Sequence, residues 1–136
     1  MTKFESSVKN ISSSQESVYN LLSDLTNIES FRDRIPENLV KDLSFDSDSL
    51  TLSVAPVGKI SFNIIEREPH KCIKFQAENS PVPFTLWIQI VAIDENRCKA
   101  KATAGLDVNP FMKSMVKKPV QDGLEKIIEV IAHLPY

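Results

Sequence analysis

The side chains that proteins use most often for catalysis are few and scattered in this sequence. Its two histidines are His70, among turn residues, and His133, close to the C-terminus. Neither belongs to a recognisable Ser-His-Asp or Cys-His arrangement, and no glycine-rich phosphate loop is present. Cys72 and Cys98 stand singly, without the paired spacing of a zinc site, so we expect both to be small packing residues. The sequence therefore predicts no conventional catalytic set, no metal site and no cofactor.

Closely spaced carboxylates are the other candidates for acid–base chemistry. Asp46 and Asp48 fall in a predicted turn, and Glu66 and Glu68 fall near the end of a predicted strand. Carboxylates in such places are usually exposed charges, and we interpret them in that way. Three further polar side chains are candidates to face an apolar interior: Ser6, Tyr19 and Ser114.

The elements that would position any site are read from hydrophobic periodicity. Between Leu39 and Val108 apolar residues alternate with polar ones in six runs, which is typical of half-buried strands. A looser alternation over residues 4–11 predicts one strand before them. Breaks too short for a crossover helix separate the runs at residues 46–49, 55–58, 68–70, 79–83 and 94–96. The pattern predicts an antiparallel sheet of about seven strands.

Helical periodicity occurs on both sides of the six runs. Serines 12–14 offer N-cap candidates for a short helix, and a second short helix should run from Thr26 or Asn27 to Arg34. From Pro110 a long amphipathic helix reaches almost to the C-terminus. Pro119 lies inside it and cannot donate a backbone hydrogen bond, so we predict a bend or interruption at residues 117–119.

This order of elements resembles the START-like (SRPBCC, helix-grip) superfamily, which includes polyketide cyclase-type proteins, the birch-pollen allergen family and coenzyme Q-binding proteins. Residues 14–24 look like that superfamily's first helix, and residues 110–134 look like its gripping helix. The resemblance covers nearly all of residues 1–136 and implies a single α+β domain. In this fold a curved sheet wraps the long C-terminal helix and leaves a cavity between them.

Small side chains recur at alternate positions of the last predicted strand: Cys98, Ala100, Ala102 and Ala104. They either let the long helix pack close to the sheet or form the floor of a pocket. We expect these four residues to line the ligand cavity together with Phe62, Phe84, Leu86, Phe111, Met112 and Met115.

Alternate turns of the meander share one end of the sheet, and at one end they are apolar. Val57, Val82 and Phe111 should meet there, close to Phe31 of the second short helix. Such an apolar rim is either the mouth of a pocket or an interface patch.

Composition narrows the class of protein. The chain has 136 residues, 42% hydrophobic and 25% charged, with a net charge of −2. No basic cluster matches a phosphate backbone, so nucleic acid is not an expected partner. The N-terminus lacks the apolar run of a secretory signal and no segment resembles a membrane span, so a cytoplasmic location without stable membrane insertion is expected.

These observations favour the binding or carriage of a small hydrophobic molecule between the sheet and the long helix. Two other hypotheses stay open, a cyclase- or dehydratase-like enzyme and a protein-interaction module. The sequence specifies neither the ligand nor the oligomeric state.

Overall fold

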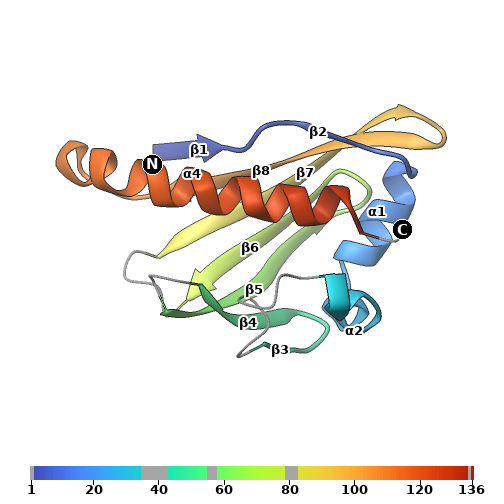
Figure 1. Ribbon diagram of the computed structural model, residues 1–136, viewed down its shortest axis with the longest axis horizontal. Coiled ribbons are helices and arrows are strands. Elements are labelled where there is room, and N and C mark those ends of the chain that lie inside the picture. The colour runs from blue at the N-terminus through green and yellow to red at the C-terminus, as the bar shows by residue number, and fades with distance from the viewer. Residues whose placement is uncertain (1, 35–42, 55–57, 79–82, 135) are drawn as a thin grey trace.

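The computed structural model describes residues 2–34, 43–54, 58–78, 83–134 and 136 (Figure 1). These residues form an antiparallel sheet, several short helices and one long C-terminal helix, α4 (Pro110–Ala132). The strands are β1 (Thr2–Glu5), β2 (Lys9–Ile11), β3 (Ser44–Phe45), β4 (Ser49–Val54), β5 (Gly58–Glu68), β6 (Cys72–Glu78), β7 (Phe84–Asp94) and β8 (Arg97–Leu106).

The sheet follows the predicted meander. Its order is β1-β8-β7-β6-β5-β4-β3, and β2 also pairs with β8, so the first and last strands lie side by side. The sheet has eight strands rather than about seven because the predicted first strand is divided after Glu5. At the break the Ser6 hydroxyl accepts a hydrogen bond from the backbone N–H of Ala102 (2.9 Å), in place of a ladder carbonyl.

The short helices form where the sequence predicts them. Ser14 caps α1 (Gln15–Leu22) by accepting a hydrogen bond from the N–H of Ser17. The second predicted helix is three short pieces, η1 (Leu25–Asn27), α2 (Ile28–Phe31) and η2 (Arg32–Arg34). The residues directly after Arg34, where we expect this helix to have ended, lie outside the described residues.

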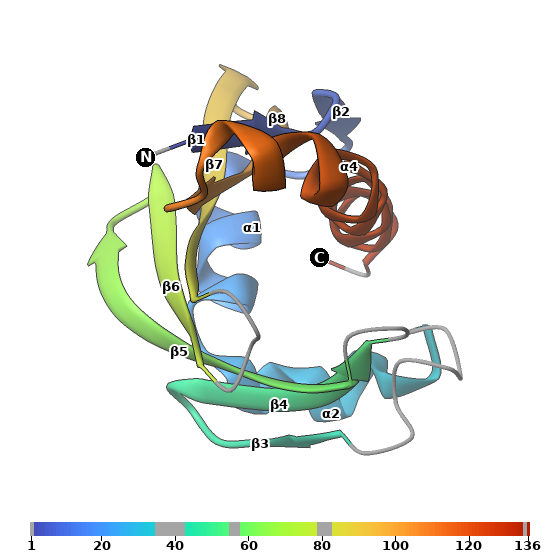
Figure 2. The same ribbon diagram turned by 90° about the vertical axis from the view of Figure 1, so that its left-hand side faces the viewer.

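Helix α4 begins at Pro110, as predicted. The Asn109 side chain accepts a hydrogen bond from the N–H of Met112 (2.8 Å), and Pro110 occupies the first turn, where its missing N–H is harmless. The helix continues through Pro119, so of the two predicted outcomes, a bend or an interruption, it does not show the interruption. Figure 2 shows a bend instead, because the orange first part of α4 is inclined to the red second part. A proline removes one hydrogen bond, and packing of the later turns keeps the helix continuous.

The sheet is curved, and α4 lies on its concave side next to β8, β1 and β2 (Figure 2). Register shifts between Ile64 and Glu66, and between Ala92 and Asp94, mark irregularities of the kind that bend and twist a sheet. The concave face carries the hydrophobic core, to which α1 contributes Val18 and Tyr19. No helix among the described residues is both long enough and apolar enough to cross a membrane.

Candidate functional site

The concave face of the sheet is apolar along every long strand. Register places Ile88 of β7 between Ile73 of β6 and Ala102 of β8, and places Phe62 of β5 beside Leu50 of β4. Side chains directly opposite one another on paired strands project to the same face. One apolar surface therefore extends from β8 to β4.

Among the described residues, the main contacts of α4 with this surface are at one end of it. Its buried residues are Leu124, Ile128 and Ile131, and the helix contacts β8, β1 and β2. The alanine row of β8 lies in the same cluster, and Ala102 is 0% exposed. Burial under the helix favours the first of the two readings of this row, in which small side chains allow close approach.

A polar seam fixes α4 to the β1–β2 edge. The carboxylate of Glu125 accepts hydrogen bonds from the N–H and the hydroxyl of Ser7, at 2.6 and 2.7 Å. One turn earlier, Gln121 donates to the carbonyl of Glu5 (2.7 Å), and one turn later Glu129 lies 3.4 Å from the ammonium of Lys9. This seam was not predicted from the sequence, although polar residues at i, i+4 and i+8 of an amphipathic helix are a visible signal of it.

The hydrogen bonds from Ser7, its hydroxyl first and its N–H second, hold the pKa of Glu125 below its usual range. A carboxylate whose pKa is lower in the folded than in the unfolded state stabilises the fold above the unfolded pKa. That stabilisation is lost as the pH falls through the folded pKa.

Glu125→Gln is therefore expected to lower the thermal unfolding midpoint most at neutral pH, with the difference from wild type shrinking towards acidic pH. Calorimetric unfolding across this pH range measures it. Glu95→Gln, an exposed carboxylate between β7 and β8, is the matched control. A difference that stays constant down to the acid limit would contradict the assignment.

The flank of α4 that faces away from the seam is apolar and only half-buried. On a helix with 3.6 residues per turn, Val120 and Ile127 lie on one side of the buried stripe, and Glu125 lies on the other. Because Glu125 contacts the β1–β2 edge, the opposite flank is directed into the curve of the sheet. Half-buried apolar side chains on this flank are Met112, Val116, Val120 and Ile127.

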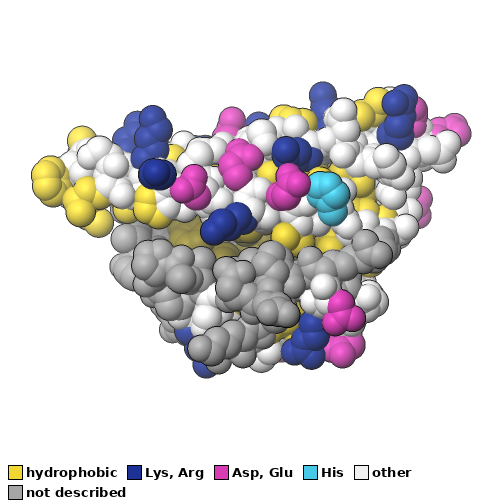
Figure 3. Space-filling view, viewed as in Figure 1, with side chains coloured by type: hydrophobic (Ala, Val, Ile, Leu, Met, Phe, Trp, Pro, Cys, Tyr) yellow, Lys and Arg dark blue, Asp and Glu magenta, His cyan; other side chains and the backbone are white. Residues whose placement is uncertain are grey.

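The sheet presents a matching set of half-buried side chains, which are Phe45, Leu50, Leu52, Ile64 and Phe84. Figure 3 shows recessed apolar surface beside α4, on the side away from β1 and β2. Large apolar side chains on two facing elements thus retain partial exposure instead of packing fully together.

The structure places the predicted cavity residues in three environments. Phe62 and Leu86 are buried on the concave face with the Cys98–Ala104 row, and the ring of Phe62 contacts that of half-buried Phe84 edge-on at 5.8 Å. Met112 is half-buried on α4. Phe111 and Met115 are 78% and 65% exposed, so they lie on the outer surface of α4 and not with the others.

The predicted apolar rim is only partly described. Val57 and Val82, and the side chain of Phe31, lie outside the described residues. Its remaining member, Phe111, is exposed at the start of α4. Both predictions for this rim, the mouth of a pocket and an interface patch, therefore stay predictions.

Two of the three polar interior candidates are engaged with the backbone. The Ser6 hydroxyl bonds the carbonyl of Ser7 and the N–H of Ala102, and exposed Ser114 bonds the carbonyl of Phe111. Tyr19 is buried, with its ring edge-on to His70 at 5.6 Å. The part of the chain that the structure describes contains no cluster of three or more histidines, cysteines or acids suited to a metal.

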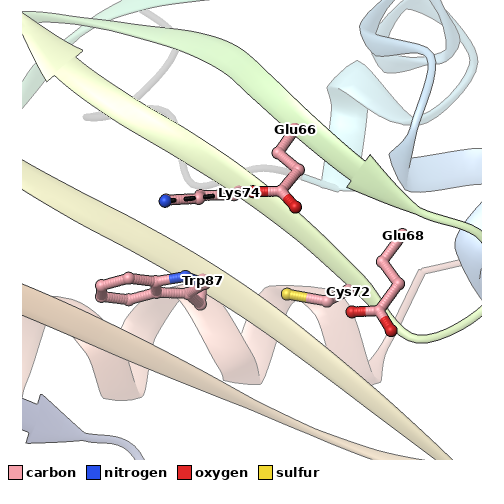
Figure 4. A pocket seen from close by; sticks show the side chains of 5 residues that line it. All are labelled: Glu66, Glu68, Cys72, Lys74 and Trp87. Carbon is pink, nitrogen blue, oxygen red and sulfur yellow. Dashed lines mark ion pairs between the residues drawn. The ribbon is translucent and has the colours of Figure 1, made fainter.

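A separate small hollow lies on the outer face of the sheet, with a volume of about 90 Å³. Figure 4 shows its lining by Glu66, Glu68, Cys72, Lys74 and Trp87. Burial and the carboxylates of Glu68 and Glu66 raise the pKa of the Cys72 thiol, which makes it a poor nucleophile at neutral pH. Pockets for drug-sized ligands occupy ~300 Å³ or more, so the hollow is too small for such a ligand.

The curved antiparallel sheet, the early short helices and the long C-terminal helix define the START-like helix-grip fold, as predicted from the sequence. No protein-family model matches the chain, and the search of curated proteins gave no significant match.

Solved structures share the fold over nearly the whole chain. Truncated norcoclaurine synthase from Thalictrum flavum superposes with a TM-score of 0.77 at 15% identity, over 96% of this chain and 91% of that one. A START superfamily protein from Mycobacterium smegmatis gives 0.68 at 15% identity, over 96% and 94%. The protein XoxI from Bacillus cereus gives 0.71 at 11% identity, over 97% and 94%. At these identities the likeness shows the fold.

Proposed function

We propose that this protein binds a small hydrophobic molecule between the concave face of the sheet and the apolar flank of α4. The observation that carries the proposal is the pair of facing, half-buried apolar surfaces. Leu52 and Phe84 represent the sheet side, and Val116 and Val120 represent the helix side. Apolar side chains that stay partly exposed on opposed concave surfaces are typical of ligand pockets.

The residues predicted from the sequence enter this proposal with different roles. Phe62, Phe84, Leu86 and Met112 would contact the ligand, and the alanine row would form the closed end of the space, beneath α4. The flexible thioether of Met112 would adapt to apolar ligands of different shape. Carriage, as opposed to binding alone, would require that the ligand be released at a destination, and the same contacts would govern that release.

Binding of an apolar fluorescent probe such as N-phenyl-1-naphthylamine tests the proposal. Val116→Trp and Val120→Trp each introduce a ring on the flank that faces the curve, and each should weaken saturable probe binding about tenfold or more by occupying the site. Val91→Trp is the matched control, because Val91 is an exposed valine on β7.

The unfolding midpoint of each variant must be measured beside the titration, because a misfolded variant would also lose the probe. If the wild type binds the probe saturably and both flank variants bind it equally well, the probe occupies a site other than the proposed one. Absence of saturable binding to the folded wild type would remove the main support for the proposal.

A further inference from the structure

An apolar patch occupies the first turns of α4, at the end of the molecule. Phe111 and Met115, four residues apart, lie on one face of the helix and are 78% and 65% exposed. The buried positions of α4, which the structure describes throughout, begin only at Leu124. Figure 1 shows the orange start of the helix extending past the strands. The patch is thus held out from the core by a continuous helix.

Basic side chains lie on the same turns of α4 as this patch. At 3.6 residues per turn, Lys118 is on the face of Phe111 and Met115, and Lys113 and Lys117 are on the opposite side of the helix. Lys113, Lys117 and Lys118 are exposed, and residues 108–121 contain no aspartate or glutamate. The whole chain has a net charge of −2, so this concentration of positive charge is local. Figure 3 shows apolar and basic side chains together at the end of the molecule where α4 begins.

Exposed apolar side chains and lysines on the same helical turns are suited to a lipid surface. At a lipid interface, an aromatic and a thioether side chain enter the region between headgroups and acyl chains, while lysines extend to the anionic phosphates. A water-exposed protein partner would satisfy the apolar pair, but only an acidic surface complements the lysines as well. An anionic bilayer supplies both, and the protein's overall negative charge makes a patch-directed orientation necessary.

We propose that the projecting start of α4 docks the protein onto the surface of an anionic lipid bilayer. Phe111 and Met115 insert, Lys118 contacts headgroups beside them, and Lys113 and Lys117 reach headgroups from the other side of the helix. This docking goes beyond ligand binding and does not require it, because the patch lies outside the apolar flank of α4. If both functions hold, the flank and the docking patch share one helix.

Sedimentation with vesicles tests the proposal on the full chain. Wild type should bind phosphatidylcholine vesicles that contain phosphatidylserine, should bind pure phosphatidylcholine far less, and should be released by high salt. The double variant Phe111→Ser, Met115→Ser should lower the partition coefficient about tenfold or more. The triple variant Lys113→Gln, Lys117→Gln, Lys118→Gln should lower it by a factor on the order of tenfold to a hundredfold.

Matched controls separate docking from general effects of polarity and charge. Val91→Ser with Ile93→Ser removes exposed apolar residues from β7, and Lys59→Gln, Lys71→Gln with Lys99→Gln removes exposed lysines elsewhere. Both controls should bind vesicles like wild type. Each variant should keep the wild-type circular dichroism and unfolding midpoint, since all the substituted side chains are exposed.

Three results would overturn the proposal. One is a folded wild type that does not bind the anionic vesicles, and another is binding that patch and control variants reduce equally. The third is self-association, without vesicle binding, that light scattering detects and Phe111→Ser abolishes, because the patch would then be an interface between copies. Probe binding by the Val116→Trp and Val120→Trp variants is a separate readout, so failure of docking is distinguishable from failure of the proposed function.

Discussion

Ala102→Trp is expected to lower the free energy of unfolding by about 3 kcal/mol or more, the upper part of the range for overpacking a core. Ala102 is 0% exposed, and it lies between Ile88 of β7 and the Ser6 hydroxyl at the edge of β1. Ser7, which follows Ser6 in the chain, donates two hydrogen bonds to Glu125 of α4. Helix α4 therefore lies close to β8 at this position. An indole ring there would have to push α4 away from β8 and strain the seam.

The measurement is equilibrium unfolding in denaturant, compared with Lys99→Trp, which adds the same ring to an exposed position on the other face of β8. Lys99→Trp should change the free energy of unfolding by about 0.5 kcal/mol or less. If Ala102→Trp proved equally harmless while it abolished probe binding, the alanine row would be the floor of an open cavity. The closed-end role given to the row would then be wrong.

Most of the fold was predictable because local chemistry and hydrophobic period agree along the chain. The alternation that includes Phe84 and Leu86 predicted β7, and Pro110 with the return of helical periodicity predicted the start of α4. Turns too short for a crossover then required antiparallel neighbours. These signals are local, so one sequence suffices to read them.

The departures arise where tertiary contacts override the local pattern. Alternation over residues 4–11 predicted one strand, but the Ser6 side chain competes for the backbone of Ala102 and Ser7 turns to α4. Pro119 predicted a bend or an interruption, and the helix bends without being interrupted. Whether the packing of later turns outweighs the hydrogen bond that an interior proline removes depends on tertiary contacts, and a local sequence pattern does not specify these.

The candidate site was less predictable for a related reason. The sequence identified the apolar stripe of α4, but it did not show which part of the stripe meets the sheet. Phe111 and Met115 continue the apolar character of the helix and nevertheless lie on its outside. The polar seam fixes the rotation of α4, and it depends on contacts between residues from opposite ends of the chain, such as Ser7 and Glu125.

Apart from the exposed patch of Phe111 and Met115, that rotation gives the helix two apolar surfaces with different expected roles. The stripe at Leu124 and Ile128 anchors the helix on β8, and the flank at Val116 and Val120 faces the curve of the sheet. A side chain that is fully packed should matter for stability, whereas one that lines a binding site should matter mainly for the ligand. Truncating one residue of the buried stripe and one residue of the flank distinguishes a packing role from a ligand-binding role.

Ile128→Ala is expected to lower the free energy of unfolding by about 2–5 kcal/mol, because Ile128 is 0% exposed and its loss leaves a cavity between α4 and β8. Val120→Ala removes less volume from a half-buried position, and should lower it by about 1 kcal/mol or less. Equilibrium unfolding and probe titration on both variants measure the contrast.

The Val120→Ala protein should still bind the probe, because truncation enlarges the proposed site and leaves the anchor intact. In the Ile128→Ala protein, which loses part of the anchor, weaker binding would follow from displacement of α4. Comparable destabilisation by the two substitutions would show that Val120 is packed as tightly as Ile128. The apolar flank would then be core, and the space proposed for the ligand would be filled by the protein's own side chains.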